Sequence, residues 1–256
     1  LSPAFQNAAL AHEGYSLRYE PLDVEPVALG ATLDALAVQG AAGNITIPFK
    51  QAVVERAHCT SLAARVGAVN TFWHERGALY GDNTDVAGVV ASIVSLCPEG
   101  IADTRCVVIG AGGAAAAVLV ALEQLGCRDI VMAVRRAEQA QELSERVRVA
   151  VEIVALDPNR LSDARLLINA TSIGMRENAM PMSPAALGKD AAVLDLVYGP
   201  NETAWVRACR AAGHRAEDGL RMLVEQGAGA FERWFAVTAP RDVMWRALSE
   251  ATGRRA

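Results

Sequence analysis

The sequence predicts an α/β protein of two domains, one of them a doubly wound parallel sheet. Three observations support this fold class. Strand-like and helix-like hydrophobic patterns alternate along the whole chain, which is typical of parallel strands connected by helices. The segment Pro98-Glu99-Gly100 interrupts that pattern and marks a linker. Beyond the linker, a short apolar strand is followed directly by a glycine-rich turn and an alanine-rich helix.

Composition is that of an ordinary folded, soluble protein. Of its 256 residues, 52% are hydrophobic and 21% are charged, with a net charge of −5, which argues against a nucleic-acid partner. The longest apolar run, residues 106–122, contains three glycines in its first half, so we expect no membrane span. Five scattered cysteines without a CxxC pair indicate reduced thiols and a cytoplasmic location. The four histidines lie far apart, and we expect no metal site.

In the first domain, each element has its own local signal. Ser2 as N-cap and Pro3 at the first helical position predict a helix that runs to about residue 13. The pattern then predicts a strand over 17–24, a helix over 26–37 and a strand over 42–47 that ends at Pro48. A helix is expected to begin near Lys50. The remaining elements are strands over 68–74 and 78–80, flanking an Arg76-Gly77 turn, and a helix over 86–96.

The second domain reads as a repeated strand–helix alternation. Its expected strands cover residues 106–109, 130–134, 151–155, 166–169, 192–196 and, as a short sixth strand, 213–217. A long helix is expected over 219–235, and a last helix follows Pro240. We therefore predict a first domain over residues 1–88 and a second over residues 89–218. The C-terminal helices, within residues 219–256, are expected to pack back on the first domain.

The glycine turn indicates a dinucleotide site. Residues 110–115 read Gly-Ala-Gly-Gly-Ala-Ala and match GxGxxA between a strand and a helix. In this motif Gly110 permits the sharp turn, Gly112 lets a pyrophosphate approach the backbone, and Ala115 allows close helix–strand packing. The following helix N-terminus offers free N–H groups and a positive dipole to phosphates. A purely structural glycine turn is the alternative.

The next strand indicates which nucleotide is bound. Sites for NAD usually carry an Asp or Glu about 20 residues past the glycines, to bond the ribose 2′-hydroxyl. Here the strand over 130–134 ends in Arg135 and Arg136, and no acid stands there. Two guanidinium groups suit a 2′-phosphate, so the sequence favours NADP(H), unless both arginines are merely solvated surface residues.

Lysine is unusually rare in this chain. Of the 24 basic residues, 22 are arginine, and the lysines are Lys50 and Lys189. Lysine can lose its proton when its surroundings lower its pKa, whereas arginine effectively cannot. Lys50 is therefore a candidate for proton transfer. Lys189, next to a glycine in a predicted loop, is interpreted as a lysine retained by chance, without a chemical role.

Polar segments recur at the chain junctions as a series of motifs. The first is a partial S-x-S-P-x-x-H/Q-N at residues 1–7. The others are N-[VI]-T-x-P-x-K at 44–50, G-A-V-N-T at 67–71, N-T-D-x-x-G at 83–88, G-A-G-G-A at 110–114, N-A-T-S-x-G-M at 169–175, D-x-x-Y-x-P-x-x-T at 195–203 and D-G-x-x-M-L-x-x-Q at 218–226. Read in order, these motifs resemble those of the shikimate dehydrogenase family, and the resemblance spans nearly the whole chain.

The resemblance implies a Rossmann-type NADP-binding domain beside an α/β substrate-binding domain. It also implies reversible reduction of 3-dehydroshikimate to shikimate with NADPH, in the biosynthesis of chorismate and aromatic amino acids. Lys50 and Asp85 match the family's acid–base pair at the reacting oxygen; which of them transfers the proton stays open.

The other implied contacts divide between substrate and cofactor. For the substrate, Ser2 and Tyr198 are expected at the carboxylate, and Thr46, Asn70 and Gln226 at the hydroxyls. For the cofactor, the resemblance implies contacts from Gly110, Ala111, Gly112, Gly113, Ala114, Arg135, Arg136, Asn169, Ala170, Thr171 and Gly219.

Two other functions are considered. A quinate/shikimate dehydrogenase that uses NAD shares the lysine, the aspartate and the glycine turn, but usually has an acid where Arg135 and Arg136 stand. A non-catalytic nucleotide-binding regulator is possible on the same fold, yet it would have no need of Lys50 together with Asp85. We expect a small-molecule substrate, no nucleic-acid or membrane partner, and a monomer or homodimer.

Overall fold

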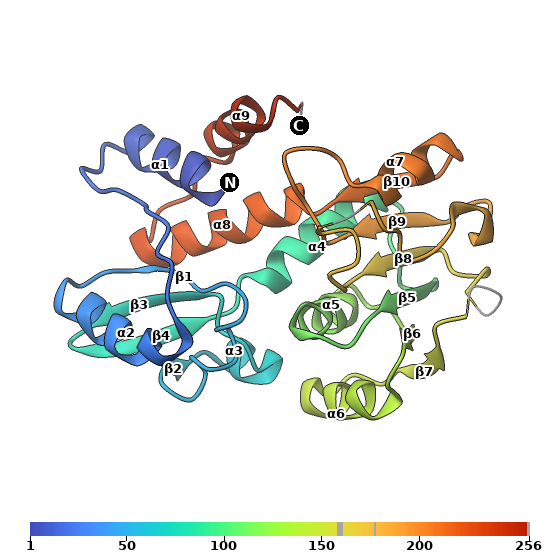
Figure 1. The fold of residues 1–256 in the computed structure, drawn as a ribbon, viewed down its shortest axis with the longest axis horizontal. Helices are drawn as coiled ribbons and strands as arrows, with labels where there is room; N and C mark the ends of the chain where they lie inside the picture. Colours follow the sequence, from blue (N-terminus) through green and yellow to red (C-terminus); the bar gives the residue numbers. More distant parts are fainter. Residues whose placement is uncertain (158–160, 177, 255–256) are drawn as a thin grey trace. The chain divides into compact units, whose positions relative to one another are not determined.

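The computed structural model describes residues 1–157, 161–176 and 178–254, and shows a mixed α/β fold (Figure 1). The chain forms two compact units. Unit 1 comprises Leu1–Asp85 and Val224–Ala256, and unit 2 comprises Val86–Leu223. The chain passes from one unit to the other within two helices, α4 (Asp85–Leu96) and α8 (Leu220–Phe235).

Unit 1 is built on a four-stranded sheet with the order β1-β3-β4-β2. Its strands are β1 (Gly43–Asn44), β2 (His58–Cys59), β3 (Thr71–Glu75) and β4 (Ala78–Asp82). The predicted Arg76-Gly77 turn joins β3 to β4, with φ of 51° and 79°. Two successive positive φ values give the backbone twist that a two-residue hairpin needs.

The helices of unit 1 mostly begin without a side-chain cap, and the N-cap of the first helix is Leu1, not the predicted Ser2. They are α1 (Ser2–His12), the 3₁₀ turn Pro26–Ala28 continued by α2 (Leu29–Val38), α3 (Ser61–Val66), the later part of α8, and α9 (Arg241–Thr252). The Thr60 side chain accepts the Ala63 amide at the start of α3, and Gly67 ends this helix in the left-handed conformation. α1 and α9 pack against each other (Figure 1).

The strand predicted over residues 17–24 does not form. Leu17 and Leu22 each expose 60% of their surface. The backbone of Tyr19 is held by a side chain instead, since its amide donates to Asn7 Oδ1 at 2.8 Å and its carbonyl accepts from Asn7 Nδ2 at 2.9 Å. The alternating apolar pattern is that of a strand, but a strand also needs a neighbouring strand to pair with.

The helix predicted from Lys50 is also wrong, because residues 47–56 form consecutive turns. The Lys50 carbonyl accepts the Val69 amide at 2.8 Å, so it does not serve the amide of Val54 one helical turn ahead. Val54 bonds the Gln51 carbonyl instead. A contact with a distant segment therefore interrupts the helical ladder and fixes the backbone at the lysine.

Unit 2 contains the predicted parallel sheet. Six strands lie in the order β10-β9-β8-β5-β6-β7, and every neighbouring pair is parallel. They are β5 (Arg105–Ile109), β6 (Asp129–Val134), β7 (Glu152–Ala155), β8 (Leu166–Asn169), β9 (Ala192–Asp195) and β10 (Arg215–Asp218). The order reverses direction at β5, as in a doubly wound sheet. The predicted fold class is confirmed.

Helices pack on this sheet and bury its central strands. They are α5 (Gly113–Gln124), α6 (Ala137–Val147) and α7 (Ala204–Ala211). Every residue of β8 and β9 is buried, as is the whole run 115–122 of α5. Such buried runs, hydrophobic except at the terminal Asn169 and Asp195, are typical of parallel strands and of the helices that pack on them. The carboxyl ends of β5, β8 and β9 are thereby held rigidly side by side.

Candidate active site

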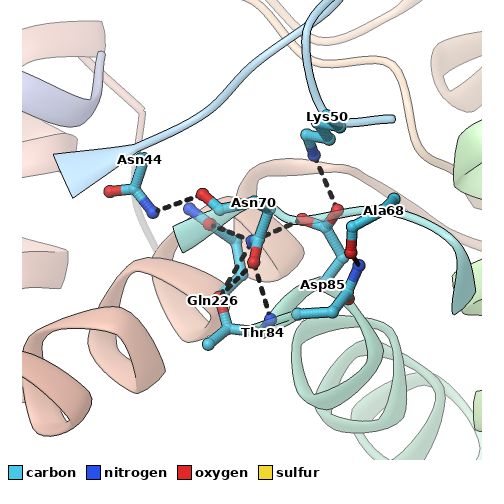
Figure 2. Close-up of polar contacts among 8 residues, drawn as sticks. Asn44, Lys50, Ala68, Asn70, Thr84, Asp85 and Gln226 are labelled. Atoms are coloured by element: carbon cyan, nitrogen blue, oxygen red, sulfur yellow. Dashed lines mark hydrogen bonds and ion pairs between the residues drawn. The ribbon is translucent and has the colours of Figure 1, made fainter. Parts of the chain in front are cut away.

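Lys50 and Asp85 form an ion pair in unit 1. Lys50 Nζ lies 2.6 Å from Asp85 Oδ2 (Figure 2). The side chains are 27% and 10% exposed, respectively, so the pair is shielded but still reachable. Asp85 is the first residue of α4, where the helix dipole stabilises a carboxylate. An ammonium held by a carboxylate in this way can give a proton to an oxygen placed against it and take it back.

Asn70 connects this pair to Thr84 and to Gln226 of α8. Its side chain is buried, with 1% of the residue exposed. Its Nδ2 lies 2.9 Å from Thr84 Oγ1, 2.9 Å from Asp85 Oδ1 and 3.1 Å from Gln226 Oε1 (Figure 2). Its Oδ1 accepts the Thr84 amide at 2.7 Å. An amide nitrogen carries two hydrogens, so the three acceptors share them. Asn70 thus orients the Asp85 carboxylate and brings α8 to it.

Asn44 and Asn83 hold the backbone around Asn70. The Asn44 side chain donates to the Asn70 carbonyl at 3.1 Å, and Asn83 Nδ2 donates to the Ala68 carbonyl at 2.9 Å. The Tyr19 hydroxyl donates in turn to Asn44 Oδ1 at 3.0 Å. The sequence motifs contain both asparagines but do not indicate that they support Asn70. Only the fold brings β1 beside Asn70, which directly precedes β3.

α8 is anchored so that Gln226 faces this cluster. The Arg233 guanidinium lies 2.6 Å from Asp82 Oδ2 and 5.5 Å from the centroid of the Trp73 ring. Asp82, 7% exposed, also accepts the Thr60 hydroxyl at 2.5 Å. Sequence reasoning missed this ion pair because its partners lie 151 positions apart.

A second anchor lies next to Gln226 along the helix. Gln6 is fully buried and donates from Nε2 to the Gly227 carbonyl at 2.9 Å. A Cβ at Gly227 would lie 2.5 Å from the Phe5 ring, so only glycine allows α1 and α8 to approach this closely. Ser2 at the start of α1 and the exposed Thr46 lie outside the hydrogen bonds described around Asn70, so the substrate residues predicted in unit 1 are only partly brought together.

The glycine turn of unit 2 has the geometry of a phosphate cradle. Gly110 has φ of +105°, which favours glycine. Gly112 is the N-cap of α5 and makes no side-chain cap. A Cβ at Gly112 or Gly113 would meet nothing within 4 Å. An uncapped helix N-terminus with open space before it fits a pyrophosphate.

Arg135 and Arg136 follow β6 directly beside this turn. β5 and β6 are paired neighbours, and the Gly110 amide donates to the Ala133 carbonyl at 3.1 Å. Both arginines are exposed, and within residues 1–157, 161–176 and 178–254 neither guanidinium has an ion-pair partner. The residues present therefore fit a dinucleotide with an additional phosphate on its ribose.

The remaining predicted cofactor and substrate residues of unit 2 lie near the carboxyl ends of β8 and β9, in the two adjoining segments that follow these strands. Thr171 packs on the glycine turn, since a Cβ at Gly110 would lie 2.7 Å from its Cγ2. Gly219 packs on the next segment, where its amide donates to the Val197 carbonyl and a Cβ would lie 3.0 Å from Tyr198 Cδ1. Asn169 is fully buried, whereas Tyr198 is 45% exposed.

These two segments line a cavity of about 550 Å³, whose wall includes Gly174, Val197, Tyr198 and Thr203. Among the described residues, no three His, Cys, Asp or Glu side chains gather closely enough to hold a metal ion. Nor does any described helix combine the length and the apolar character needed to cross a membrane.

Comparisons with family models account for most of the chain. Residues 1–72 match the shikimate dehydrogenase substrate binding domain. Residues 93–181 match the shikimate/quinate 5-dehydrogenase model, and residues 219–248 match the shikimate 5′-dehydrogenase C-terminal domain.

Named relatives match over nearly full length. The NADP⁺-dependent shikimate dehydrogenase of Mesorhizobium japonicum is 42% identical over 96% of this chain and 90% of its own. That of Moorella thermoacetica is 40% identical over 99% and 90%.

Solved structures have the same fold. Shikimate 5-dehydrogenase of Thermus thermophilus, in complex with NADP(H) and shikimate, superposes with a TM-score of 0.88 at 32% identity, covering 98% of this chain and 94% of that one. Quinate dehydrogenase of Corynebacterium glutamicum, in complex with NAD, gives 0.89 at 30% identity, covering 97% and 94%.

Proposed function

Because the chain belongs to the shikimate dehydrogenase family, we propose that it catalyses the reversible, NADPH-dependent reduction of 3-dehydroshikimate to shikimate. The observation that carries this proposal is the Lys50–Asp85 pair, 2.6 Å apart, at the positions of the family's acid–base motifs. The relatives named above as shikimate dehydrogenases are NADP⁺-dependent, and the two exposed arginines after β6 agree with that cofactor.

Lys50 supplies the proton in this reaction. Reduction of a ketone to an alcohol requires a hydride at carbon, which bound NADPH supplies, and a proton at oxygen. The Lys50 ammonium donates that proton to the ketone oxygen and recovers it in the reverse direction. Asp85 orients the ammonium through Oδ2, while Asn70 fixes Oδ1 of the same carboxylate.

From the family resemblance, we assign the substrate contacts to five side chains. The Asn70 and Gln226 amides and the Thr46 hydroxyl bind the hydroxyl groups of the substrate. The Ser2 and Tyr198 hydroxyls bind its carboxylate. Tyr198 agrees with this role because it is 45% exposed and lines the cavity of unit 2.

The cofactor contacts are assigned along the carboxyl edge of the unit 2 sheet. Residues 110–114 and the N-terminus of α5 receive the pyrophosphate, and Arg135 and Arg136 receive the 2′-phosphate. Ala170 and Thr171 line the cofactor cleft, and Gly219 lies near the nicotinamide. We place the enzyme in the cytoplasm, in the biosynthesis of chorismate and aromatic amino acids, as a monomer or homodimer.

A direct test follows absorbance at 340 nm with shikimate or quinate, each combined with NADP⁺ or NAD⁺. The proposal predicts reduction of NADP⁺ by shikimate. A dominant rate with quinate or NAD⁺ would assign the chain to the quinate/shikimate relatives, and no rate in any mixture, from folded protein, would favour a nucleotide-binding regulator.

The chain offers a matched pair of lysine variants for the chemistry. We expect Lys50→Ala to lower kcat by about 10²–10⁴ while leaving the fold intact, because it removes the positioned acid. Lys189→Ala, at the other, exposed lysine, is expected to keep the wild-type rate. Equal rates for the two variants would contradict the role of Lys50.

A further inference from the structure

Asn169 has no hydrogen-bonding capacity left for a ligand. Its Nδ2 donates to Asp195 Oδ1 at 2.8 Å and to the Ile173 carbonyl at 3.1 Å. Its Oδ1 accepts the amide and the hydroxyl of Thr171, at 3.1 and 2.6 Å. An asparagine side chain offers two hydrogens and two lone pairs, so all four are used inside the protein.

Asp195 extends this network to the neighbouring segment and is 1% exposed. Besides Asn169, its Oδ1 accepts the Val197 amide at 3.2 Å, and its Oδ2 accepts the Thr203 hydroxyl at 2.7 Å. The Thr203 oxygen also accepts the Val206 amide at the start of α7. One buried carboxylate thus connects the end of β8, the chain leaving β9 and the N-terminus of α7.

The network lies directly behind the surfaces that a cofactor would touch. Thr171 Cγ2 is the atom closest to a Cβ built on Gly110, so the Thr171 side chain packs directly against the glycine turn. Val197 and Thr203 belong to the cavity wall. In doubly wound sheets, ligands bind outside these carboxyl ends.

We propose that Asn169 and Asp195 are positioning residues for the dinucleotide. Without touching it, they hold residues 170–175 and 196–203 in the arrangement that binds it. This inference rests on the proposed cofactor site, and it assigns to Asn169 a role different from the direct contact that the family resemblance implies. Asp195, which the sequence motif contains without an assigned role, becomes the centre of the arrangement.

The two oxygens of Asp195 accept hydrogen bonds from different kinds of donor, and this difference provides a test. Oδ1 receives two N–H donors that cannot reverse, whereas Oδ2 receives a hydroxyl that can rotate and accept instead. Asp195→Asn, with its nitrogen toward Thr203, therefore keeps both hydrogen bonds to the oxygen and reverses the one to the Thr203 hydroxyl. Burial raises the pKa of the Asp195 carboxyl, so loss of its charge is tolerated there.

The experiment measures the dissociation constant for NADP⁺ by calorimetry, together with kcat at saturating substrates and the unfolding midpoint. We expect Asn169→Ala to weaken NADP⁺ binding about tenfold or more, the effect of one or two lost hydrogen bonds, with a smaller effect on kcat at saturation. Asp195→Asn is expected to bind NADP⁺ within about threefold of wild type. Val193→Ala, a buried apolar control on β9, is expected to lower the midpoint and leave NADP⁺ binding unchanged.

A second pair of variants covers the case in which Asn169→Ala does not fold. Thr203→Val removes the hydroxyl that Asp195 accepts, and Thr203→Ser retains it, so only the valine variant is expected to weaken NADP⁺ binding. Unchanged binding in Asn169→Ala or in Thr203→Val would overturn the proposal, and so would equal weakening in Val193→Ala. If the wild-type chain binds no NADP⁺ and oxidises no shikimate, the proposed function itself has failed.

Discussion

Replacing Gly110 by alanine tests the glycine turn with an effect that can be worked out from the geometry. Gly110 has φ of +105°, a conformation that costs an L-residue roughly 1–2 kcal/mol. The new Cβ would lie 2.7 Å from Thr171 Cγ2 and 3.3 Å from the Ala170 carbonyl oxygen. Overpacking of this kind costs about 1–3 kcal/mol. We therefore expect Gly110→Ala to lower the free energy of unfolding by about 2–5 kcal/mol.

A matched control separates the two causes. Gly126 also has positive φ, at +76°, but a Cβ there meets its nearest atom, of Ala102, at 3.9 Å. Gly126→Ala therefore carries the backbone cost without the crowding, and we expect a loss of about 1–2 kcal/mol. Urea denaturation, extrapolated to water, gives both values.

The crowding also has a functional consequence. Because it pushes Thr171 away from the glycine turn, NADP⁺ binding should weaken about tenfold or more in Gly110→Ala, and stay at the wild-type level in Gly126→Ala. The reasoning would be refuted if Gly110→Ala were no more destabilising than Gly126→Ala and bound NADP⁺ as tightly as wild type.

Three further predictions concern charged groups. Replacing Arg135 and Arg136 by alanine should raise KM for NADP⁺ about 10–100-fold and leave NAD⁺ kinetics nearly unchanged, since only NADP⁺ carries the 2′-phosphate. Equal effects on the two cofactors in steady-state assays would contradict this. Arg233→Met should lower the free energy of unfolding, measured in urea, by about 1–3 kcal/mol, because it removes the ion-pair partner of the buried Asp82 carboxylate; a value near zero would refute it. Burial raises the pKa of Asp195, so the stability that its protonated form contributes is complete below the ordinary value near 3.8 and is lost as pH rises through the raised pKa. Wild type should therefore lose stability relative to Asp195→Asn as pH rises from the ordinary value through the raised pKa, and a difference that does not vary with pH would contradict this.

The sheet of unit 2 could be predicted from the sequence because its signals are local. β5, β8 and β9 are short runs with buried apolar residues and clear ends, and the glycine turn follows the first of them. The backbone of unit 1 is harder to predict from the sequence, because its conformation depends on hydrogen bonds to residues distant in the chain. The Val69 amide diverts the Lys50 carbonyl from a helix, and the Asn7 side chain occupies the backbone of residue 19.

The candidate site was predicted in part, through motifs rather than through contacts. Family motifs pointed to Lys50, Asp85 and Asn70, but nothing local indicates that residues 35 positions apart form an ion pair. For the Asn169–Asp195 network, the sequence contains one indication: each of two otherwise apolar strands ends in a polar residue. That signal indicates an important position without distinguishing a ligand contact from a support.

The distinction can be made by counting hydrogen-bonding capacity. The four positions of Asn169 are all filled by protein groups, so a ligand could bind to it only by breaking the turn that it organises. Asn70 differs, because its two hydrogens are shared among three acceptors and the contact to Gln226, at 3.1 Å, is the longest. We therefore expect a substrate hydroxyl to replace that contact while Asn70 keeps its hydrogen bond to Asp85. On this reasoning the two buried asparagines are predicted to differ: Asn70 both binds substrate and orients Asp85, whereas Asn169 only orients.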